Sequence, residues 1–579
     1  MVLSRAWRVW DLNAGLRPSA LCERRLRRIF ARHVGRADGV CGVAATLDRE
    51  RSIARSMGVS ERMTTHMRNT LIAACIATTA AMIVPATLPQ MVMPMQQTLH
   101  ADPNEMAVLR RMPDVISMLV VFPIAAIGVR FGPTLVFQAC GTLMIVGSFL
   151  VMFAPIIESA IIGLAFVALA RVAVTISALA AIAMVFAESP LRARAFARYG
   201  MMSPIVYLVV PLLAGFVLSK QDWRVLGGFW LIAGIATLLS GALLRDRAKV
   251  AEPQGTADRG GSLTQPPQDS RKRVELWTPF AAGFVLLSAV QALAEGVDFN
   301  FNPEFYAWCA ATAVFASLFA LARRRVARPA FRWDAFRVRG FSRVLIALAV
   351  FSGVNLHFYV MLVLQYGYAQ SPLATASLML PAQCTGVVGA IAAGRWMMRK
   401  GAMTIAHWSL WATAGVLVAS AWPMLARSPF TIAAILCVYG FVSTIASIAL
   451  TTTLMQLGDA KVARMVAALR SSMSGAGSAI GIIVLSFIVS EVMVSSMSTR
   501  VRSEGGSDEM AAKISAAIRH DEATSSIAET LDLNEVHAQL LSSLRHEVIL
   551  DGFAAHGIAG GIGVGVAAIL LATTMRRRM

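Results

Sequence analysis

The chain has 579 residues, of which 56% are hydrophobic and only 15% are charged. A soluble domain carries roughly a quarter charged residues, and a soluble protein of this length divides into domains with charged surfaces. The mean hydropathy of +0.63 therefore excludes a soluble globular protein and predicts an integral membrane protein.

The net charge of +20 is carried by short basic clusters between apolar runs, which is the pattern of cytoplasmic loops and not of a nucleic-acid-binding surface. The seven cysteines show no paired or metal-like spacing. The sequence contains no nucleophile–base set, metal cluster or phosphate loop. The glycine-rich segments at 475–481 and 561–565 follow no predicted strand, so we expect packing faces there and not a dinucleotide site. We therefore expect neither an enzyme nor a bound cofactor or metal.

Residues 1–69 form an Arg-rich N-terminal stretch. It has no apolar core, so we expect no cleavable signal peptide, and the first span acts as an uncleaved signal anchor. Met63 and Met67 lie just before this span. The stretch is therefore either a disordered basic tail or the result of a misassigned translation start. In both cases, deletion of residues 1–62 is expected to leave insertion and activity intact.

The apolar runs are about twenty residues long, the length of a helix that crosses a bilayer. They predict an all-α membrane protein with fourteen transmembrane helices. The spans are 70–94, 111–129, 134–154, 157–184, 200–219, 225–244, 278–296, 304–322, 343–366, 373–395, 404–425, 429–455, 470–493 and 551–574.

The basic loops predict the orientation, because such loops resist translocation during insertion. With a cytoplasmic N-terminus, the Arg-rich loop at 323–343 and the Arg run at 576–578 are inside, whereas the acidic loop at 295–304 is outside. A missing span would invert every later loop, so the pattern predicts an even number of spans and two cytoplasmic termini. In the long outside segment 494–550, apolar residues at helical spacing predict two short amphipathic helices on the outer face, at 511–518 and 531–544.

Two loops on the cytoplasmic side share a pattern. Arg130 and Gly132 follow the second span, and Arg399 and Gly401 follow the tenth. In both, an Arg and a Gly two residues later turn the chain between two helices, as in transporters built from two repeated bundles. We expect an N-terminal six-helix bundle at 70–244, a cytoplasmic linker at 245–276, an inserted helix pair with a basic loop at 277–342, and a C-terminal six-helix bundle at 343–579.

Further motifs follow in order along the spans. They are Arg171 in span 4, Pro211 and Gly215 in span 5, Asp222-Trp223-Arg224 before span 6, Arg328-Pro329 and Phe336-Arg337 with Gly340-Phe341 before span 9, and Gln365, Ser371-Pro372-Leu373 and Leu380-Pro381 around the start of span 10. With these motifs, the chain from about residue 70 onwards resembles the fourteen-span drug:proton antiporter branch of the major facilitator superfamily, the EmrB/QacA-type transporters. The resemblance implies the major facilitator fold, with two six-helix bundles and two inserted helices, in a bacterial inner membrane.

The chain also departs from this family at acidic positions. The family carries an Asp in span 1 shortly before an Ala-Leu-Pro, whereas this chain has Thr-Leu-Pro at 87–89 and Ala80 at the Asp position. The Asp of the cytoplasmic loop is replaced by Val129 in the first repeat and by Met398 in the second. In the family these acids serve proton coupling and the cytoplasmic latch, so the resemblance implies the architecture and leaves the coupling open.

Two charged residues within the spans are candidates for transport and coupling. Arg171 lies about thirteen residues into span 4, near the bilayer centre. A charge there persists only when it faces a cavity or a partner. Arg171 therefore either binds an anionic substrate or tunes a nearby acid, or it is a structural Arg bonded to helix carbonyls. Asp114 lies about 10 Å shallower, which disfavours a direct pair with Arg171; it either carries protons or pairs with Arg110 or Arg111.

Uncharged residues in the spans are further candidates. Pro211 and Gly215 permit a bend and close helix packing in span 5, and packing alone is the alternative. His357, Gln365 and Gln383 in spans 9 and 10 either line a central cavity or bond between helices.

The leading interpretation is a secondary transporter that exports amphipathic small molecules or drugs by proton antiport. Its partners are then the small-molecule substrate, protons and the lipid bilayer, and the resemblance adds a periplasmic adaptor protein; nucleic acid is not expected. Two alternatives stay open. One is a carrier with altered or no proton coupling, such as one for an organic anion drawn to Arg171. The other is a transport-inactive membrane sensor or scaffold.

Overall fold

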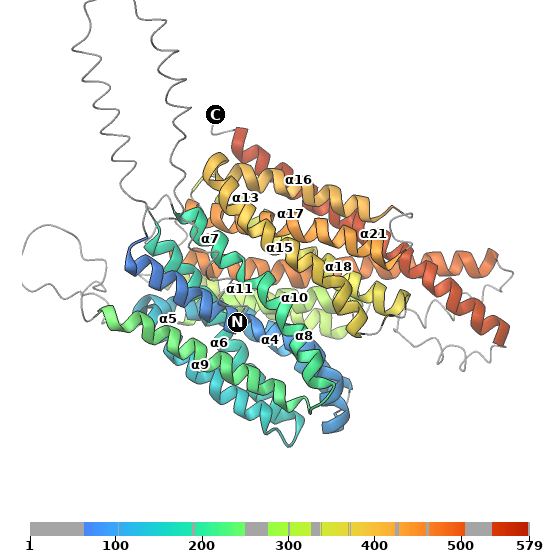
Figure 1. Cartoon of the computed structure of the whole chain (residues 1–579), viewed down its shortest axis with the longest axis horizontal. Coiled ribbons are helices and arrows are strands. Elements are labelled where there is room, and N and C mark those ends of the chain that lie inside the picture. Colours follow the sequence, from blue (N-terminus) through green and yellow to red (C-terminus); the bar gives the residue numbers. More distant parts are fainter. Residues whose placement is uncertain are drawn as a thin grey trace, which may run out of the picture. The chain divides into compact units, whose positions relative to one another are not determined.

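The computed structural model describes residues 63–101, 103–187, 191–248, 276–298, 302–325, 336, 338–368, 370, 372–422, 428–458, 463–503 and 535–576 (Figure 1). Within these ranges all regular structure is helical. The helices are α4 (Thr65–Leu99), α5 (Pro103–Met152), α6 (Ile157–Val185), α7 (Arg192–Gly200), α8 (Met202–Leu218), α9 (Arg224–Ala248), α10 (Trp277–Asp298), α11 (Pro303–Arg325), α13 (Phe341–Gly353), α14 (Leu356–Leu362), η2 (Val363–Gly367), α15 (Pro372–Lys400), α16 (Ala402–Ser420), α17 (Pro429–Leu457), α18 (Ala463–Ser503) and α21 (Glu535–Arg576).

Fourteen helical segments of the described chain are long and apolar enough to cross a membrane, which confirms the predicted number. A helix is favoured there because lipid offers no hydrogen bonds, so every backbone group must be satisfied within the segment. Two spans form the single helix α5, and two other spans are each built from more than one helix, namely α7 with α8 and α13 with α14 and η2.

The helices of the first six spans pack on one another through small residues. Helix α5 contacts α6 and α9, and α4 contacts α6, α8 and α9. Gly147 and Gly163 lie so close that a Cβ on either would come within 2.7 Å of the other's carbonyl oxygen. In the core, the indole N–H of Trp230 donates to the Thr87 hydroxyl at 2.7 Å, and both side chains are buried. This bond joins the first span to the sixth.

The last six spans pack in the same manner. Helix α13 contacts α18 and α21, α15 contacts α17, and α16 contacts α17 and α21. In α18, Gly477 and Gly481 lie directly against Ala349 and Gly353 of α13, as a packing face predicts. Gly475 differs, since a Cβ there would meet no atom within 4 Å.

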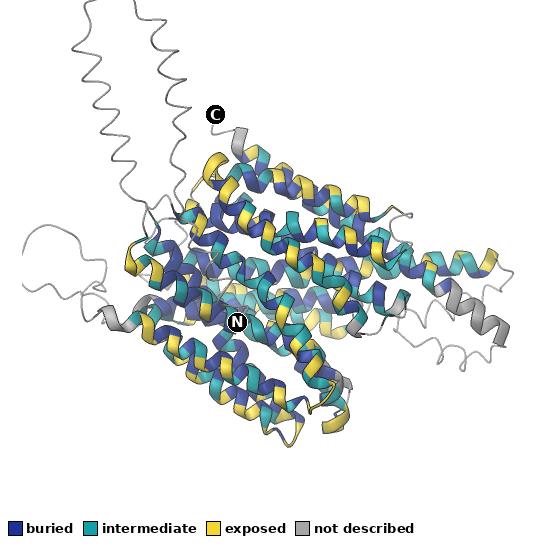
Figure 2. Ribbon diagram, viewed as in Figure 1, coloured by how far each residue is buried: buried dark blue, intermediate teal, exposed yellow. Residues whose placement is uncertain are grey.

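The inserted pair lies against both halves. Helix α10 contacts α5 and α18, whereas α11 packs mainly on α10, where Thr312 donates to Ser288 at 3.0 Å. None of the described residues of α11 is buried in the protein. Helices α9 and α16 likewise carry exposed residues along their outer sides (Figure 2). Such apolar outer surfaces are expected where helices face lipid.

The long outside segment differs from its prediction. Helix α18 continues to Ser503, and α21 already begins at Glu535, so the region expected as a separate helix at 531–544 is mostly the first part of α21, ahead of the apolar span at 546–574. No Pro or Gly interrupts residues 535–551, and Arg500 of α18 pairs with Glu547 and Asp551 of α21. These ion pairs hold the C-terminal end of α18 to α21.

Several predicted features lie outside the described residues. They are the tail 1–62, linker residues 249–275, basic-loop residues 326–335, outside-segment residues 504–534 with the helix expected at 511–518, and the C-terminal residues 577–579. The Arg328-Pro329 motif is therefore among the undescribed parts.

Candidate functional site

The two repeated loops turn at their glycines. Gly132 has φ 74° and ψ 170°, and Gly401 has φ 81° and ψ 150°. This region of positive φ strongly favours glycine, because a Cβ clashes with the backbone there. A Cβ at either position would meet no other atom within 4 Å, so backbone conformation alone explains the two glycines. Arg399 is exposed, and the side chain of Arg130 lies outside the described residues.

The two halves of the transmembrane unit meet near these turns. Arg192 of α7 donates to the carbonyl oxygen of Met455 in α17. A Cβ at Gly200 would overlap Ile448, and Gly394 lies against Ala197. These contacts all fall in those halves of spans 5, 10 and 12 that the basic loops predict to be cytoplasmic.

Arg171 projects from α6 towards α5. Its Nη2 donates to the Ser117 hydroxyl at 3.3 Å, while its Nε is buried without a hydrogen-bond partner among the described residues. The charge of Arg171 also interacts with Asp114 and with Tyr207 of α8. Helices α5, α6 and α8 thus bring four polar side chains together. The sequence reasoning found Arg171 and Asp114 but missed Ser117 and Tyr207.

Asp114 lies three residues before Ser117, on the same face of α5. Its carboxylate is exposed and interacts electrostatically with Arg171, without a direct ion pair between the two side chains. The side chain of Arg110 lies outside the described residues. Asp114 thus interacts with the central Arg171, and its pairing with Arg110 or Arg111 stays a prediction.

Pro211 lies within the continuous helix α8. The Gln90 amide of α4 donates to the carbonyl oxygen of Pro211 at 3.2 Å, which joins spans 1 and 5. A Cβ at Gly215 would meet no atom within 4 Å, so close packing in this arrangement does not account for that glycine.

The ninth span is interrupted near its middle. Helix α13 ends at Gly353, Val354 is extended with φ −96° and ψ 101°, and α14 begins at Leu356. The Tyr439 hydroxyl of α17 donates to the Val354 carbonyl at 3.0 Å. His357 lies directly after the break and is half-buried. The candidates Gln365, in the π-helical turn η2, and Gln383, in α15, are also half-buried; their place in a cavity stays a prediction.

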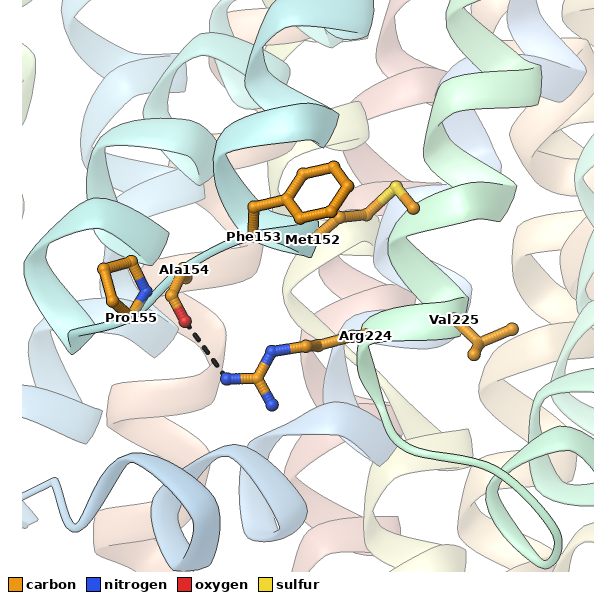
Figure 3. A pocket seen from close by; sticks show the side chains of 6 residues that line it. All are labelled: Met152, Phe153, Ala154, Pro155, Arg224 and Val225. Atoms are coloured by element: carbon orange, nitrogen blue, oxygen red, sulfur yellow. Dashed lines mark hydrogen bonds between the residues drawn. The ribbon is translucent and has the colours of Figure 1, made fainter.

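A hollow of about 440 Å³ lies beside the Asp222-Trp223-Arg224 motif (Figure 3). Arg224 donates to the Ala154 carbonyl at 3.1 Å and pairs with Asp222 at 3.0 Å, and Trp223 is buried. The motif therefore fastens the turn between spans 3 and 4 to the start of span 6. None of the candidate transport residues lines this hollow.

Comparisons with known proteins agree with this architecture. The family model described as Major Facilitator Superfamily matches residues 70–482. No curated protein sequence matches the chain significantly. The crystal structure of the human organic anion transporter MFSD10 (TETRAN) is similar with a TM-score of 0.54 and 12% identity, covering 88% of this chain and 100% of that one. The fucose:proton symporter FucP of E. coli gives a TM-score of 0.46 and 9% identity, covering 87% and 98%. The chain thus belongs to the Major Facilitator Superfamily, whose members are transporters.

Proposed function

We propose that the protein is a proton-coupled secondary transporter for amphipathic small molecules that carry an anionic group, with Arg171 as the residue that binds the anion. The supporting observation is that the guanidinium of Arg171 has an N–H donor without a hydrogen-bond acceptor among the described residues. Its described hydrogen bond goes to the neutral Ser117, and its buried Nε has no partner there. A guanidinium has five N–H donors, so a substrate carboxylate or sulfonate can accept a bidentate pair of hydrogen bonds.

The energetics favour a ligand over a purely structural Arg. Placing a guanidinium at the bilayer centre costs about 3 kcal/mol or more. A structural Arg offsets that cost by bonding helix carbonyls, yet the side-chain bond described for Arg171 goes to the Ser117 hydroxyl. An anionic substrate supplies the hydrogen-bond acceptor that the buried Nε of Arg171 lacks among the described residues.

Asp114 supports a coupling of this anion to protons. Its negative charge already interacts with Arg171. When a substrate anion binds Arg171, the nearby carboxylate of Asp114 repels it, so protonation of Asp114 and anion binding favour each other. By thermodynamic linkage, protonation strengthens anion binding by the same factor by which the bound anion strengthens protonation. Proton and anion then move together, which is symport.

The contacts between the two halves support a state closed on one side. With the predicted orientation, Arg192–Met455 and Gly200–Ile448 lie in the cytoplasmic halves of their spans. Transport then requires these contacts to separate in an inward-open state.

The test uses purified protein in proteoliposomes with two matched substrates, an amphipathic carboxylic acid and its uncharged amide. We expect accumulation of the acid only, driven by a pH gradient and lost when an ionophore collapses it. Arg171→Gln removes a charged hydrogen bond of about 1.5–3 kcal/mol, so binding of the acid should weaken about 10- to 150-fold. Arg171→Lys restores charge without the planar fork and should recover binding only in part.

Arg111→Gln is the matched control, because Arg111 is an exposed Arg of the adjacent helix α5. It should leave binding of the acid unchanged. Equal binding of acid and amide, or equal losses in the Arg111 and Arg171 variants, contradicts an anion site at Arg171.

A second candidate function is export of amphipathic drugs by proton antiport. The observation in its favour is the exposed carboxylate of Asp114, which can attract a cationic drug in exchange for a proton; the motif resemblance to the antiporter branch agrees with it. This function predicts transport of cationic and not anionic amphiphiles, in the direction opposite to the proton gradient. Failure of transport with all substrates supports the membrane-sensor alternative.

A further inference from the structure

A second polar site lies in the last six spans, around the interruption of span 9. We call His357, Tyr359, Tyr439, Ser486 and His556 the histidine cluster. They come from α14, α17, α18 and α21; α14 contacts α17 and α21, and α18 contacts α17 and α21. Non-helical backbone at membrane depth is tolerated only where protein covers it or where it lines a cavity.

His556 is the most buried member of the cluster. Its side chain is fully enclosed, and neither ring nitrogen has a hydrogen-bond partner among the described residues. The ring lies 3.9 Å from the ring of Tyr359, centroid to centroid. The Tyr359 hydroxyl in turn shares a hydrogen bond with Ser486 at 2.9 Å. His556 is ten residues into its span, which places it well inside the membrane.

His357 lies on the same short helix as Tyr359. Its Nε2 is also buried without a hydrogen-bond partner among the described residues. The centroids of the His357 and Tyr439 rings lie 5.5 Å apart, in an edge arrangement. Tyr439 donates to the carbonyl oxygen exposed by the break, at Val354. Both imidazoles thus contact groups whose position depends on how span 9 bends.

The other titratable groups around the cluster are Tyr359 and Tyr439. No charged side chain of the described residues interacts with either imidazole. Along α18, Glu491 lies five residues beyond Ser486. Along α21, Asp551 lies five residues before His556 and is bonded to Ser496 and Arg500. On these two helices, the carboxylates closest in sequence to the cluster are therefore engaged elsewhere or more than one turn away.

We propose that the histidine cluster is a second proton-binding site of the transporter, with His556 taking up one proton at a free ring nitrogen. Imidazole is the side chain whose ordinary titration falls near neutral pH. An imidazolium is unstable in the apolar enclosure seen here, so the protonated form favours an arrangement in which span 9 bends and water reaches the ring. A proton that binds one conformation better shifts the equilibrium towards it. This inference rests on the proton coupling proposed above.

Nuclear magnetic resonance tests the binding step without any substrate. The nine histidines of the full chain in detergent micelles are labelled with ¹³C at the ring, and the pH is varied from about 5 to 8, where histidine titrates. His556→Gln and His556→Asn assign the signal, and His407→Gln removes a histidine outside the cluster as a control. We expect the His556 signal to shift with pH. A signal that stays fixed over the whole range overturns the proposal.

Transport measurements test the coupling step. One proton per substrate contributes a tenfold accumulation for each pH unit of gradient. His556→Gln should therefore accumulate about tenfold less substrate per pH unit, while substrate counterflow, which needs no net proton movement, continues. His407→Gln should accumulate as the unmodified protein does. Unchanged accumulation in His556→Gln overturns the proposal. If the unmodified protein transports nothing, the proposed function fails, and the titration still decides whether His556 binds a proton.

Discussion

The contact between spans 9 and 13 gives a quantitative prediction for Gly481→Ala. Gly481 of α18 lies against the backbone of Gly353, the last residue of α13 before the break. A Cβ at 481 would overlap the Cα and the carbonyl group of Gly353. Because these are backbone atoms, no side-chain rotation relieves the overlap, and the two helices must separate.

The balance of two effects sets the magnitude. Ala in place of Gly favours a helix by up to about 1 kcal/mol. Overpacking costs about 1–3 kcal/mol, and separation also loses about 0.1–0.2 kcal/mol for each close pair of atoms. With about ten such pairs, which contribute about 1–2 kcal/mol, the net destabilisation is about 1–4 kcal/mol. Gly475→Ala is the matched control in the same helix, since a Cβ there meets nothing within 4 Å. It should be neutral or stabilising by up to about 1 kcal/mol.

Thermal unfolding of both variants in the same detergent, followed by tryptophan fluorescence, measures the difference. We expect a lower unfolding temperature for Gly481→Ala and an equal or higher one for Gly475→Ala. Because Gly353 adjoins the break in span 9, Gly481→Ala should also slow transport. If both variants unfold at the same temperature, the close backbone contact is not present in the folded protein.

Three further predictions address coupling, packing and topology. Asp114→Asn keeps the shape of the side chain without its titratable charge, so it should lower the accumulation driven by the pH gradient about tenfold per pH unit, leave the share coupled through His556, and retain substrate binding; a normal response to the gradient makes Asp114 merely interfacial. Trp230→Phe removes the buried hydrogen bond to Thr87 and should destabilise the protein by about 1–2 kcal/mol, measured by the same thermal unfolding; an unchanged unfolding temperature argues against that bond. A cysteine introduced at position 520 should react with an impermeant maleimide in intact cells, and labelling only after lysis reverses the predicted orientation.

The features predicted from the sequence are those that depend on local composition. The fourteen predicted apolar runs correspond to fourteen helical spans in the described chain, because each span satisfies its own backbone hydrogen bonds. The Arg-x-Gly loops at Gly132 and Gly401 marked two real turns, since a positive φ needs glycine at that position. These signals are contained within a few neighbouring residues.

Partners across space could not be predicted in this way. Ser117 is one of many serines in the spans, and only the packing of α5 on α6 places it beside Arg171. The extension of α21 back to Glu535 depends on Arg500 of another helix. The break in span 9 did carry a signal, since Gly353 and Asn355 together disfavour a helix interior. Asn355 caps the new helix, its side chain accepting from the N–H of Phe358 at 3.4 Å.

The missing acids of the family motif raise the question of how this chain holds its two halves together. Arg192 joins the two halves by a hydrogen bond, because it donates to the Met455 carbonyl in the last turn of α17. The last carbonyls of a helix have no partner within that helix, and they carry the negative end of its dipole. An Arg at this position gains a charge-assisted hydrogen bond without any carboxylate. The contact between the halves therefore does not depend on the aspartates that Val129 and Met398 replace. The two proposed proton-binding sites, Asp114 and His556, lie within the bundles and not at the loops between them.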